Sequence, residues 1–482
     1  MNILLINPWI TDFAAYDFWV KPLGLLYVAS FLRERRHQVR LVDCLDRFQP
    51  SGSDGKPSVK GRYNTGKFRR EIIAKPDCLV HVPRYFCRYG ISDDAFIKLV
   101  TAGEKPDTIL VSCAMTYWYP GAFRVISLVR ELWPDVPVVL GGIYATLCPD
   151  HAREYSDSSV VITDNSPFRI IEAVEAAGGE TGEGPVVPDE FDRWPAPAWE
   201  LYDNLKTAPV LTTRGCPMRC TVCASRLLFD GFERADPEKT AAEILRLGER
   251  GVEDIAFCDD ALLIDPGSHA IPLFTALIER KNRVRLHSPN GLHVRGITTQ
   301  TARLMKQAGM TTVRLSLETA SHERAQDFSS KVTCDEFRSA AEALYGTGYL
   351  PDDLGAYVLI GLPGQTMDEV LDTIAFSLDN GIKVRPALFS PVPGTVEFMR
   401  AVGAGMIRDD EDPLLQNNTL RTVDFWEDGE EGYRRFKKWL NAENERVGKR
   451  FLRDDSRALS LVRSLGKHRA NIHDIDSIDQ SY

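Results

Sequence analysis

The sequence has no apolar run that approaches the roughly 18 consecutive residues of a membrane-spanning helix. Its N-terminal stretch MNILLINPW is too short for the apolar part of a secretory signal, and no basic segment precedes it. We therefore expect a cytoplasmic protein without a membrane span. Thiols stay reduced in the cytoplasm, where clustered cysteines bind metal more often than they pair.

Positive charge is also scarce. The 58 Lys and Arg residues are outnumbered by 68 Asp and Glu residues, which gives a net charge of −10. This balance gives no indication of a broad nucleic-acid-binding surface. The longest basic cluster, RERRHQVR at 33–40, is typical of the solvated end of a helix. The apolar fraction of 44% is ordinary for a globular protein, and 482 residues suffice for two to four domains.

Residues 1–177 alternate short apolar runs with amphipathic stretches. The runs are rich in β-branched residues and read NILLIN, QVRLVDC, DTILVSC, VPVVLGG and SSVVIT. This alternation predicts a doubly wound, Rossmann-like parallel sheet, which binds ligands beyond the carboxyl ends of its strands. The loops at 43–46, 112–119 and 141–145 are expected at that edge.

Two segments interrupt the pattern. Residues 50–105 are too many for an ordinary connection, and they form either a lid or an added subdomain. Residues 178–204 are rich in Gly, Pro and acids, which is typical of a linker.

A second αβ series covers residues 205–400. Its predicted strands are VLTTRG, DIAFCDD, RLHSPNG, TTVRLSLET, GAYVLIGLP and KVRPALFSP. Six such units predict a partial or full (β/α) barrel with its active site at the carboxyl ends of the strands. Residues 401–482 are charged and are expected to form a small helical C-terminal domain. The fold class is therefore α/β, with a Rossmann-like sheet, a barrel and a helical tail.

Three of the ten cysteines, Cys216, Cys220 and Cys223, lie within eight residues. Thiolate ligands select iron–sulfur clusters, zinc or copper(I). A structural zinc site usually takes four ligands in two close pairs, and this sequence has no second pair. Three cysteines around a four-iron cluster leave one iron open for reaction. A non-catalytic metal-binding or sensor protein is the alternative from another class.

The CxxxCxxC spacing after the first barrel strand resembles that of radical S-adenosylmethionine (SAM) enzymes of the cobalamin-binding type. The segments IAFCDDALL, SPNGLHVRGIT, VRLSLETAS, VLIGLPGQT and FSPVPGT resemble the later strand motifs of that family. The resemblance implies a [4Fe-4S] cluster on the three cysteines, which are both metal ligands and catalytic residues. It also implies SAM on the open iron, which is cleaved to methionine and a 5′-deoxyadenosyl radical.

The resemblance assigns further residues to SAM. Asn290, Ser316 and Glu318 match positions that contact its ribose and methionine parts. Leu362 and Gly364 are expected along the adenine. Val222 stands where the family usually has an aromatic residue beside the adenine, which is a departure. From the residues alone, these polar side chains are only the ends of strands around one barrel mouth.

The first domain resembles the cobalamin-binding module that precedes many radical SAM barrels. Candidate cobalamin contacts are Ser112, Met115, Tyr117, Gly141 and Gly142. An ordinary turn would also need the glycines, and the aromatic residue could equally pack in the core. The Asp-x-His-x-x-Gly loop that supplies an axial histidine is absent, and TDNS at 163–166 replaces a common Gly-x-Gly-Glu. Some relatives bind cobalamin without that histidine, so both alternatives stay open.

With cobalamin, the resemblance implies methyl transfer to an unactivated carbon or phosphorus centre. Without it, the enzyme would catalyse a rearrangement, cyclisation or oxidation, and its first domain would recognise the substrate. Asp259 and Asp260 are candidate substrate contacts, or they cap the following turn. The substrate, a small molecule or a peptide, has no signature in the sequence. Such enzymes take electrons from an external donor such as flavodoxin or ferredoxin.

Overall fold

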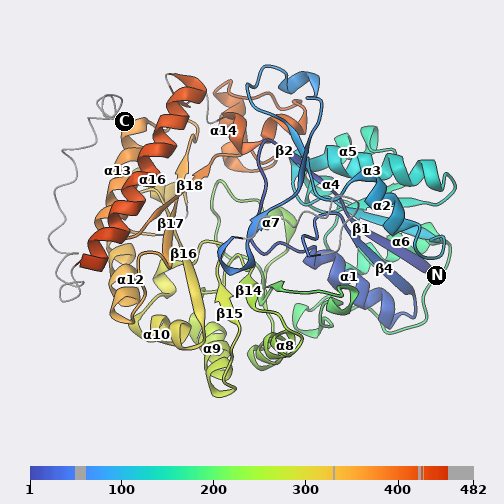
Figure 1. Cartoon of the computed structure of the whole chain (residues 1–482), viewed down its shortest axis with the longest axis horizontal. Coiled ribbons are helices and arrows are strands. Elements are labelled where there is room, and N and C mark those ends of the chain that lie inside the picture. Colours follow the sequence, from blue (N-terminus) through green and yellow to red (C-terminus); the bar gives the residue numbers. More distant parts are fainter. Residues whose placement is uncertain (49–60, 329–331, 422–424, 427, 454–482) are drawn as a thin grey trace.

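The computed structural model describes residues 1–48, 61–328, 332–421, 425–426 and 428–453. Two parallel sheets lie side by side, with the N-terminal sheet on the right of Figure 1 and the larger C-terminal sheet on the left. Among the described residues, no helix has both the length and the apolar character needed to cross a membrane. The predicted α/β class is confirmed.

The N-terminal sheet has five parallel strands in the order β10-β9-β8-β1-β4. They are β1 (Asn2–Asn7), β4 (Gln38–Asp43), β8 (Thr108–Ser112), β9 (Val138–Gly141) and β10 (Val160–Val161). Alternate residues of β1 pack on opposite sides, Leu4 and Ile6 on one and Ile3 and Leu5 on the other. Both faces are therefore buried, which confirms the doubly wound prediction.

Helices cover each face of this sheet. On one face lie α1 (Leu23–Glu34) and α6 (Pro167–Gly178). On the other lie α2 (Asp93–Val100), α3 (Tyr119–Leu132) and α5 (Pro149–Tyr155), while the short α4 (Ile143–Leu147) follows β9. The strand order reverses between β1 and β8, so the ligand-binding edge is expected at the carboxyl ends of these strands and of β9.

The long insertion forms two small antiparallel sheets together with residues 10–17. One sheet has the order β2-β7-β6, and the other pairs β3 with β5. Their bounds are β2 (Ile10–Asp12), β3 (Tyr16–Asp17), β5 (Gly66–Lys67), β6 (Arg70–Ile72) and β7 (Cys87–Tyr89). Helix α2, inside the predicted insertion 50–105, packs on the main sheet instead. We call the two small sheets the subdomain; whether it acts as a lid stays a prediction, and 49–60 lie outside the described residues.

The C-terminal sheet has six parallel strands in chain order. They are β11 (Thr207–Val210), β14 (Asp254–Phe257), β15 (Arg285–His287), β16 (Met310–Glu318), β17 (Leu354–Ile360) and β18 (Val384–Leu388). Within the described residues β11 pairs only with β14 and β18 only with β17, so the barrel is partial. The predicted strand VLTTRG is divided, because β12 (Thr213–Gly215) leaves the barrel and pairs with β13 (Phe232–Arg234).

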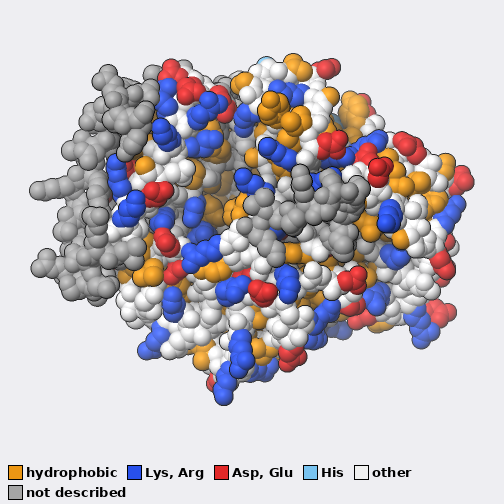
Figure 2. Space-filling model, viewed as in Figure 1, with side chains coloured by type: hydrophobic (Ala, Val, Ile, Leu, Met, Phe, Trp, Pro, Cys, Tyr) orange, Lys and Arg blue, Asp and Glu red, His pale blue; other side chains and the backbone are white. Residues whose placement is uncertain are grey.

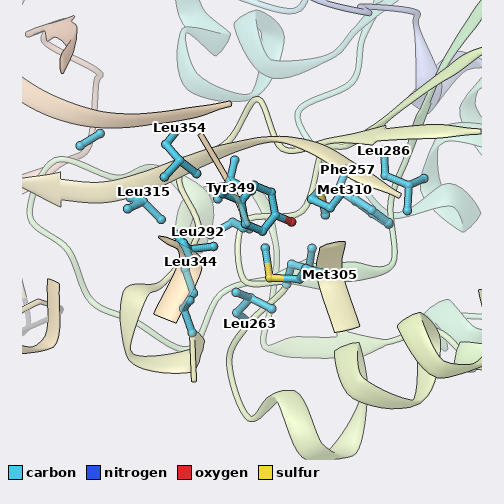
Figure 3. Close-up of a cluster of buried hydrophobic side chains, with 14 of the residues drawn as sticks. Phe257, Leu263, Leu286, Leu292, Met305, Met310, Leu315, Leu344, Tyr349 and Leu354 are labelled. Atoms are coloured by element: carbon cyan, nitrogen blue, oxygen red, sulfur yellow. The ribbon is translucent and has the colours of Figure 1, made fainter. Parts of the chain in front are cut away.

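Helices surround the outside of this sheet and bury its outer face. They are α8 (Pro237–Glu249), α9 (Ala270–Glu279), α10 (Thr299–Gln307), α12 (Cys334–Gly346) and α13 (Met367–Asp379). Figure 3 shows part of the core between strands and helices, where Leu315 and Leu354 lie with Leu344. Shorter helices are α7 (Ser225–Leu228), α11 (His322–Asp327), α14 (Val396–Gly403) and α15 (Asn418–Arg421).

The predicted linker and tail are both packed against other elements. Phe191 and Trp194 of the linker are buried against α1. Helix α16 (Gly429–Arg453) lies along the barrel at the left of Figure 1. Its Phe436 and Leu440 belong to the barrel core, and Asn444 exchanges hydrogen bonds of 2.8 and 3.0 Å with the backbone of Val384. Helix α16 therefore packs on the barrel, whereas Leu414 belongs to the core of the first domain, and the predicted domain boundaries stay a prediction.

Candidate cofactor and active site

The three clustered cysteines lie in the loop 216–224, between β12 and α7. Cys220 is buried, Cys216 is half-buried and Cys223 is exposed. The Cys223 N–H donates to the carbonyl of Cys220 at 3.2 Å, and the Ser225 N–H donates to the Cys223 Sγ at 3.4 Å. An N–H that points at a sulfur stabilises the thiolate form, which is the form that binds iron.

The loop is fixed at both ends by features that its spacing does not reveal. Gly215 has a φ of +76°, and a Cβ there would lie 2.3 Å from the Gly231 carbonyl oxygen, so only glycine fits before Cys216. Thr221 Oγ1 donates to Glu397 Oε1 at 2.9 Å, and the Glu397 N–H donates to the Thr221 carbonyl at 3.2 Å. Glu397 is 1% exposed and pairs with Arg400 at 2.7 Å. Helix α14 therefore holds the cysteine loop.

Asp259 and Asp260 hold the segments on either side of the cysteine loop. Asp259 Oδ1 accepts the hydroxyls of Thr212 and Thr213, each at 2.8 Å, and both of their N–H groups. Asp260 Oδ2 accepts the Ser225 hydroxyl at 2.7 Å. These contacts indicate that the pair positions β12 and α7. Substrate contact by either carboxylate stays a prediction.

Burial raises the pKa of Asp259 from 3.8 to about 6, although the hydrogen bonds from Thr213 and Thr212 oppose this shift. The pKa of Asp259 is higher in the folded protein than in the unfolded chain. The protonated side chain therefore contributes fully to stability below pH 3.8, and this contribution is lost as the pH rises through about 6. Between pH 5 and 7.5 we expect the wild type to lose about 1 kcal/mol of unfolding free energy relative to Asp259→Asn. Denaturant unfolding of both proteins across this range measures the difference, and parallel pH profiles would contradict it.

Asn290, Ser316 and Glu318 converge at the barrel mouth. Asn290 Nδ2 donates to the carbonyls of Cys258 and Asp259 at 3.0 and 3.2 Å. Ser316 is buried beside Gly291, where a Cβ would lie 2.4 Å from the serine Oγ. Glu318 ends β16 at an irregularity in the register, with a φ of 66°. The three predicted SAM contacts thus lie at the ends of neighbouring strands.

Val222 and Leu362 meet in one small apolar cluster, although 140 positions of sequence separate the cysteine loop from the end of β17. The cluster also contains Phe328, Phe389 and Phe398. The cluster supplies aromatic rings next to Val222, and contact of Val222 or Leu362 with adenine stays a prediction. No local pattern in the sequence predicted that these residues would meet.

Gly364 lies in the turn after β17, with a φ of +68° and no neighbouring atom within 4 Å of a built Cβ. Gln365 fixes this turn, because its Oε1 accepts the N–H groups of Gly361 and Leu362 at 2.8 and 3.2 Å. Sequence reasoning missed Gln365. A buried amide directly after a glycine turn was the available signal.

The candidate cobalamin contacts gather at the carboxyl edge of the first sheet. Ser112 and Gly141 are paired in register at the ends of β8 and β9. Gly142 has a φ of +91°, and a Cβ there would lie 2.7 Å from the Cys113 carbonyl oxygen and 2.8 Å from Ser112 Oγ. The turn therefore requires glycine for its own shape, and it leaves exposed backbone where a planar ligand could approach.

The aromatic candidate at this edge is less accessible. Met115 is half-buried, but Tyr117 is only 5% exposed and packs edge-on against Trp118. Burial raises the pKa of Tyr117 well above its ordinary value. This environment favours the packing alternative for Tyr117, and its contact with a cofactor stays a prediction.

The cysteine loop and the carboxyl edge of the first sheet adjoin each other. Helix α4, which follows Gly142, contacts α7, which follows the cysteines. Asn165, after β10, donates from Nδ2 to the Leu228 carbonyl at 3.2 Å. The two candidate cofactor sites therefore share one boundary between the domains.

The donor set suits an iron–sulfur cluster better than a single metal ion. No three His, Cys, Asp or Glu side chains in the described part of the chain lie close enough together to hold one ion. The three sulfurs lie on one irregular loop, and one of them accepts an N–H, as the thiolate ligands of iron–sulfur clusters do.

Comparisons with known proteins agree with this geometry. Residues 210–377 match the radical SAM superfamily, and residues 85–172 match the B12 binding domain. An uncharacterized methyltransferase of Pyrococcus horikoshii is 24% identical over 80% of this chain and 79% of its own. The cytidylyl-2-hydroxyethylphosphonate methyltransferase of Streptomyces wedmorensis is 22% identical over 89% and 87%.

Two solved structures share the fold. The radical SAM methyltransferase TsrM from Kitasatospora setae, with cobalamin and a [4Fe-4S] cluster bound, has a TM-score of 0.60 at 16% identity and covers 89% of this chain and 86% of its own. The cobalamin-dependent radical SAM enzyme OxsB has a TM-score of 0.55 at 14% identity, over 86% of this chain and 56% of its own.

Proposed function

Because this chain carries a radical SAM domain behind a B12-binding domain, we propose that it is a cobalamin-dependent radical SAM methyltransferase. Its acceptor would be an unactivated carbon or phosphorus centre. That it is an enzyme follows from the domain pair and from two methyltransferase relatives that cover most of the chain. The alternative of a non-catalytic sensor is therefore not supported.

The proposal assigns the cluster, SAM and cobalamin each to residues of this chain. Cys216, Cys220 and Cys223 would hold the cluster, and the mouth residues Asn290 and Glu318 would orient SAM. The Gly142 turn would carry cobalamin. When bound, these groups together supply an adenosyl radical that abstracts hydrogen and a methyl group that replaces it.

The observation that carries the proposal is the contact between α4 and α7. It brings the edge of the first sheet to the loop of the three cysteines, so that a substrate at this boundary reaches both sites. Rigid support is what such chemistry needs from the protein, because positioning and the exclusion of water are its main contributions. Glu397 and Asp259 supply that support on the cysteine side.

Residues of the first 64 positions also pack against a buried pair of the barrel, His287 and Asp254. Trp19 stacks on His287 with ring centres 4.2 Å apart, and Asn64 donates to Asp254 at 2.7 Å. His287 and Asp254, joined at 2.9 Å, are both fully buried. Trp19 and Asn64 therefore cover this buried pair, and the substrate would enter from the mouth or from the unpaired edges of the barrel.

The test is anaerobic reconstitution of the protein with iron, sulfide and hydroxocobalamin, followed by desalting and a visible spectrum. SAM and dithionite are then added, and 5′-deoxyadenosine and S-adenosylhomocysteine are measured. We expect retained cobalamin, absorbance near 400 nm and both products. Cleavage of SAM without retained cobalamin would instead favour the cobalamin-independent enzyme, whose first domain reads the substrate. A colourless protein without cleavage would overturn the proposal.

The reductant and the compartment are proposed on the same basis. A radical SAM domain uses an external electron source, and flavodoxin or ferredoxin would supply it here. A cytoplasmic location remains a prediction. Both are consistent with a chain whose described helices include none that could span a membrane.

A further inference from the structure

Three neighbouring barrel strands carry polar side chains toward the inside of the barrel at two successive levels, Arg314 beside Gly355 and Arg385 beside Tyr357. On β16, β17 and β18 the residues Val313, Ala356 and Val384 belong to the core against the helices. Because strand residues alternate between faces, Arg314, Tyr357 and Arg385 point to the opposite, inner face. Tyr357 is in register with Ser316 on one side and with Arg385 on the other.

Gly355 makes room for the two arginines. A Cβ at this position would lie 3.1 Å from Arg385 Cγ and 3.3 Å from Arg314 Cδ. The stems of both arginines therefore pass over the same glycine. Arg314 is largely buried, and burial followed by repulsion from Arg385 lowers its pKa to about 10.

In the part of the chain that the structure describes, neither guanidinium forms a hydrogen bond or ion pair with a carboxylate, although Asp353 attracts Arg314 and Asp352 attracts Arg385 at longer range. Arg314 donates only to the backbone carbonyls of Val313 and Asp353, at 3.2 and 3.3 Å. Arg385 is exposed and has no hydrogen bond or ion pair within those residues.

The nearby acidic side chains have other partners. Asp352 pairs with Lys383, and Asp353 accepts the Leu350 N–H at 3.2 Å and lies 3.6 Å from Lys306 Nζ. Two like charges in a partly buried place are unfavourable unless an anion joins them. Figure 2 shows one face of the molecule, on which Lys and Arg side chains are spread among acidic and hydrophobic ones.

We propose that Arg314 and Arg385 bind an oxyanion group of the substrate, of the phosphoryl, phosphonyl or carboxylate type. This inference rests on the proposed function, since it names the substrate class of that site. Guanidinium groups bind such groups through paired N–H donors. Arg385 is level with Ser316, which precedes Glu318 on β16, so the anion would lie below the mouth where the reaction takes place. The rest of the substrate would extend from this anion to the mouth of the barrel.

The test is anaerobic calorimetry on the cluster-loaded protein with three probes, pyrophosphate, methylphosphonate and acetate. We expect the wild type to bind at least one probe. In Arg385→Gln, which changes an exposed side chain, the affinity for that probe should fall at least about tenfold. Arg314→Met replaces a buried cation by an apolar group of similar length and should weaken it likewise. Arg303→Gln, an exposed arginine on α10, is the matched control and should bind as the wild type does.

The probes distinguish the two sources of the anion. Preference for pyrophosphate or methylphosphonate assigns a phosphorus oxyanion, and preference for acetate assigns a carboxylate. Absence of binding by all three probes, in wild-type protein that still cleaves SAM, would overturn this inference and leave the proposed function intact. The inference would also be overturned if Arg385→Gln weakened the binding of SAM and of none of the probes, because the arginine would then hold the carboxylate of SAM. Loss of SAM cleavage in the wild type would instead contradict the proposed function.

Discussion

Replacement of Cys220 by alanine is expected to remove the iron–sulfur cluster and reduce SAM cleavage to background. Cys220 is the buried member of the three, with its Sγ 3.7 Å from the Phe328 carbonyl oxygen. Two remaining cysteines leave a second iron without a protein ligand, and such a cluster is readily lost. Iron analysis, absorbance near 400 nm and 5′-deoxyadenosine formation measure the effect.

Cys334→Ala is the matched control, because this half-buried cysteine begins α12, outside the cysteine loop. It should keep its iron and its activity. The first domain should stay folded in both variants, since its core contains none of these residues. Cleavage of SAM at the wild-type rate by Cys220→Ala would show that the loop 216–224 is not the cluster site.

Replacement of Gly142 by alanine is expected to abolish cobalamin retention while iron and SAM cleavage persist. The backbone at this position has a φ of +91°, where a side chain is strained by roughly 1–2 kcal/mol. The added Cβ would also collide with the carbonyl oxygen of Cys113. The turn must therefore move at the edge where the ligand approaches. The measurement is bound cobalamin per chain after desalting, read with the iron content of the same sample.

The control for this variant is Gly346→Ala at the end of α12. No atom lies within 4 Å of a Cβ built there, and its φ is not in the left-handed region. It should retain cobalamin as the wild type does. Equal retention by Gly142→Ala would indicate that the turn does not contact the cofactor, and loss of iron as well would indicate a general disturbance of the boundary between α4 and α7.

Local signals predicted much of this protein because they are properties of short segments. Apolar runs such as NILLIN and GAYVLIGLP form buried strands because of their own composition. Their alternation with helical segments predicted the two parallel sheets. The CxxxCxxC spacing likewise needs only one loop. The strand prediction that failed in part, VLTTRG, is interrupted at Leu211 and Thr212, where Asp259 holds the Thr212 N–H and hydroxyl, and β12 then pairs with β13.

Contacts between distant segments had no such signal. Helix α16 was predicted as a helix, but its place in the barrel wall depends on Asn444 meeting the backbone of Val384, 60 residues away. The anchor between Glu397 and Thr221 spans 176 residues, and the stack of Trp19 on His287 joins the subdomain to the barrel.

The sequence by itself therefore determined the fold class, the cysteine loop and the cofactor chemistry that its spacing resembles. The tertiary structure alone decided which side chains support that loop, how the two domains meet at α4 and α7, and that two arginines share the space over Gly355. The physical reason is that hydrophobic periodicity and motif spacing act over a few residues, whereas a site is built from groups that meet only when the whole chain has folded.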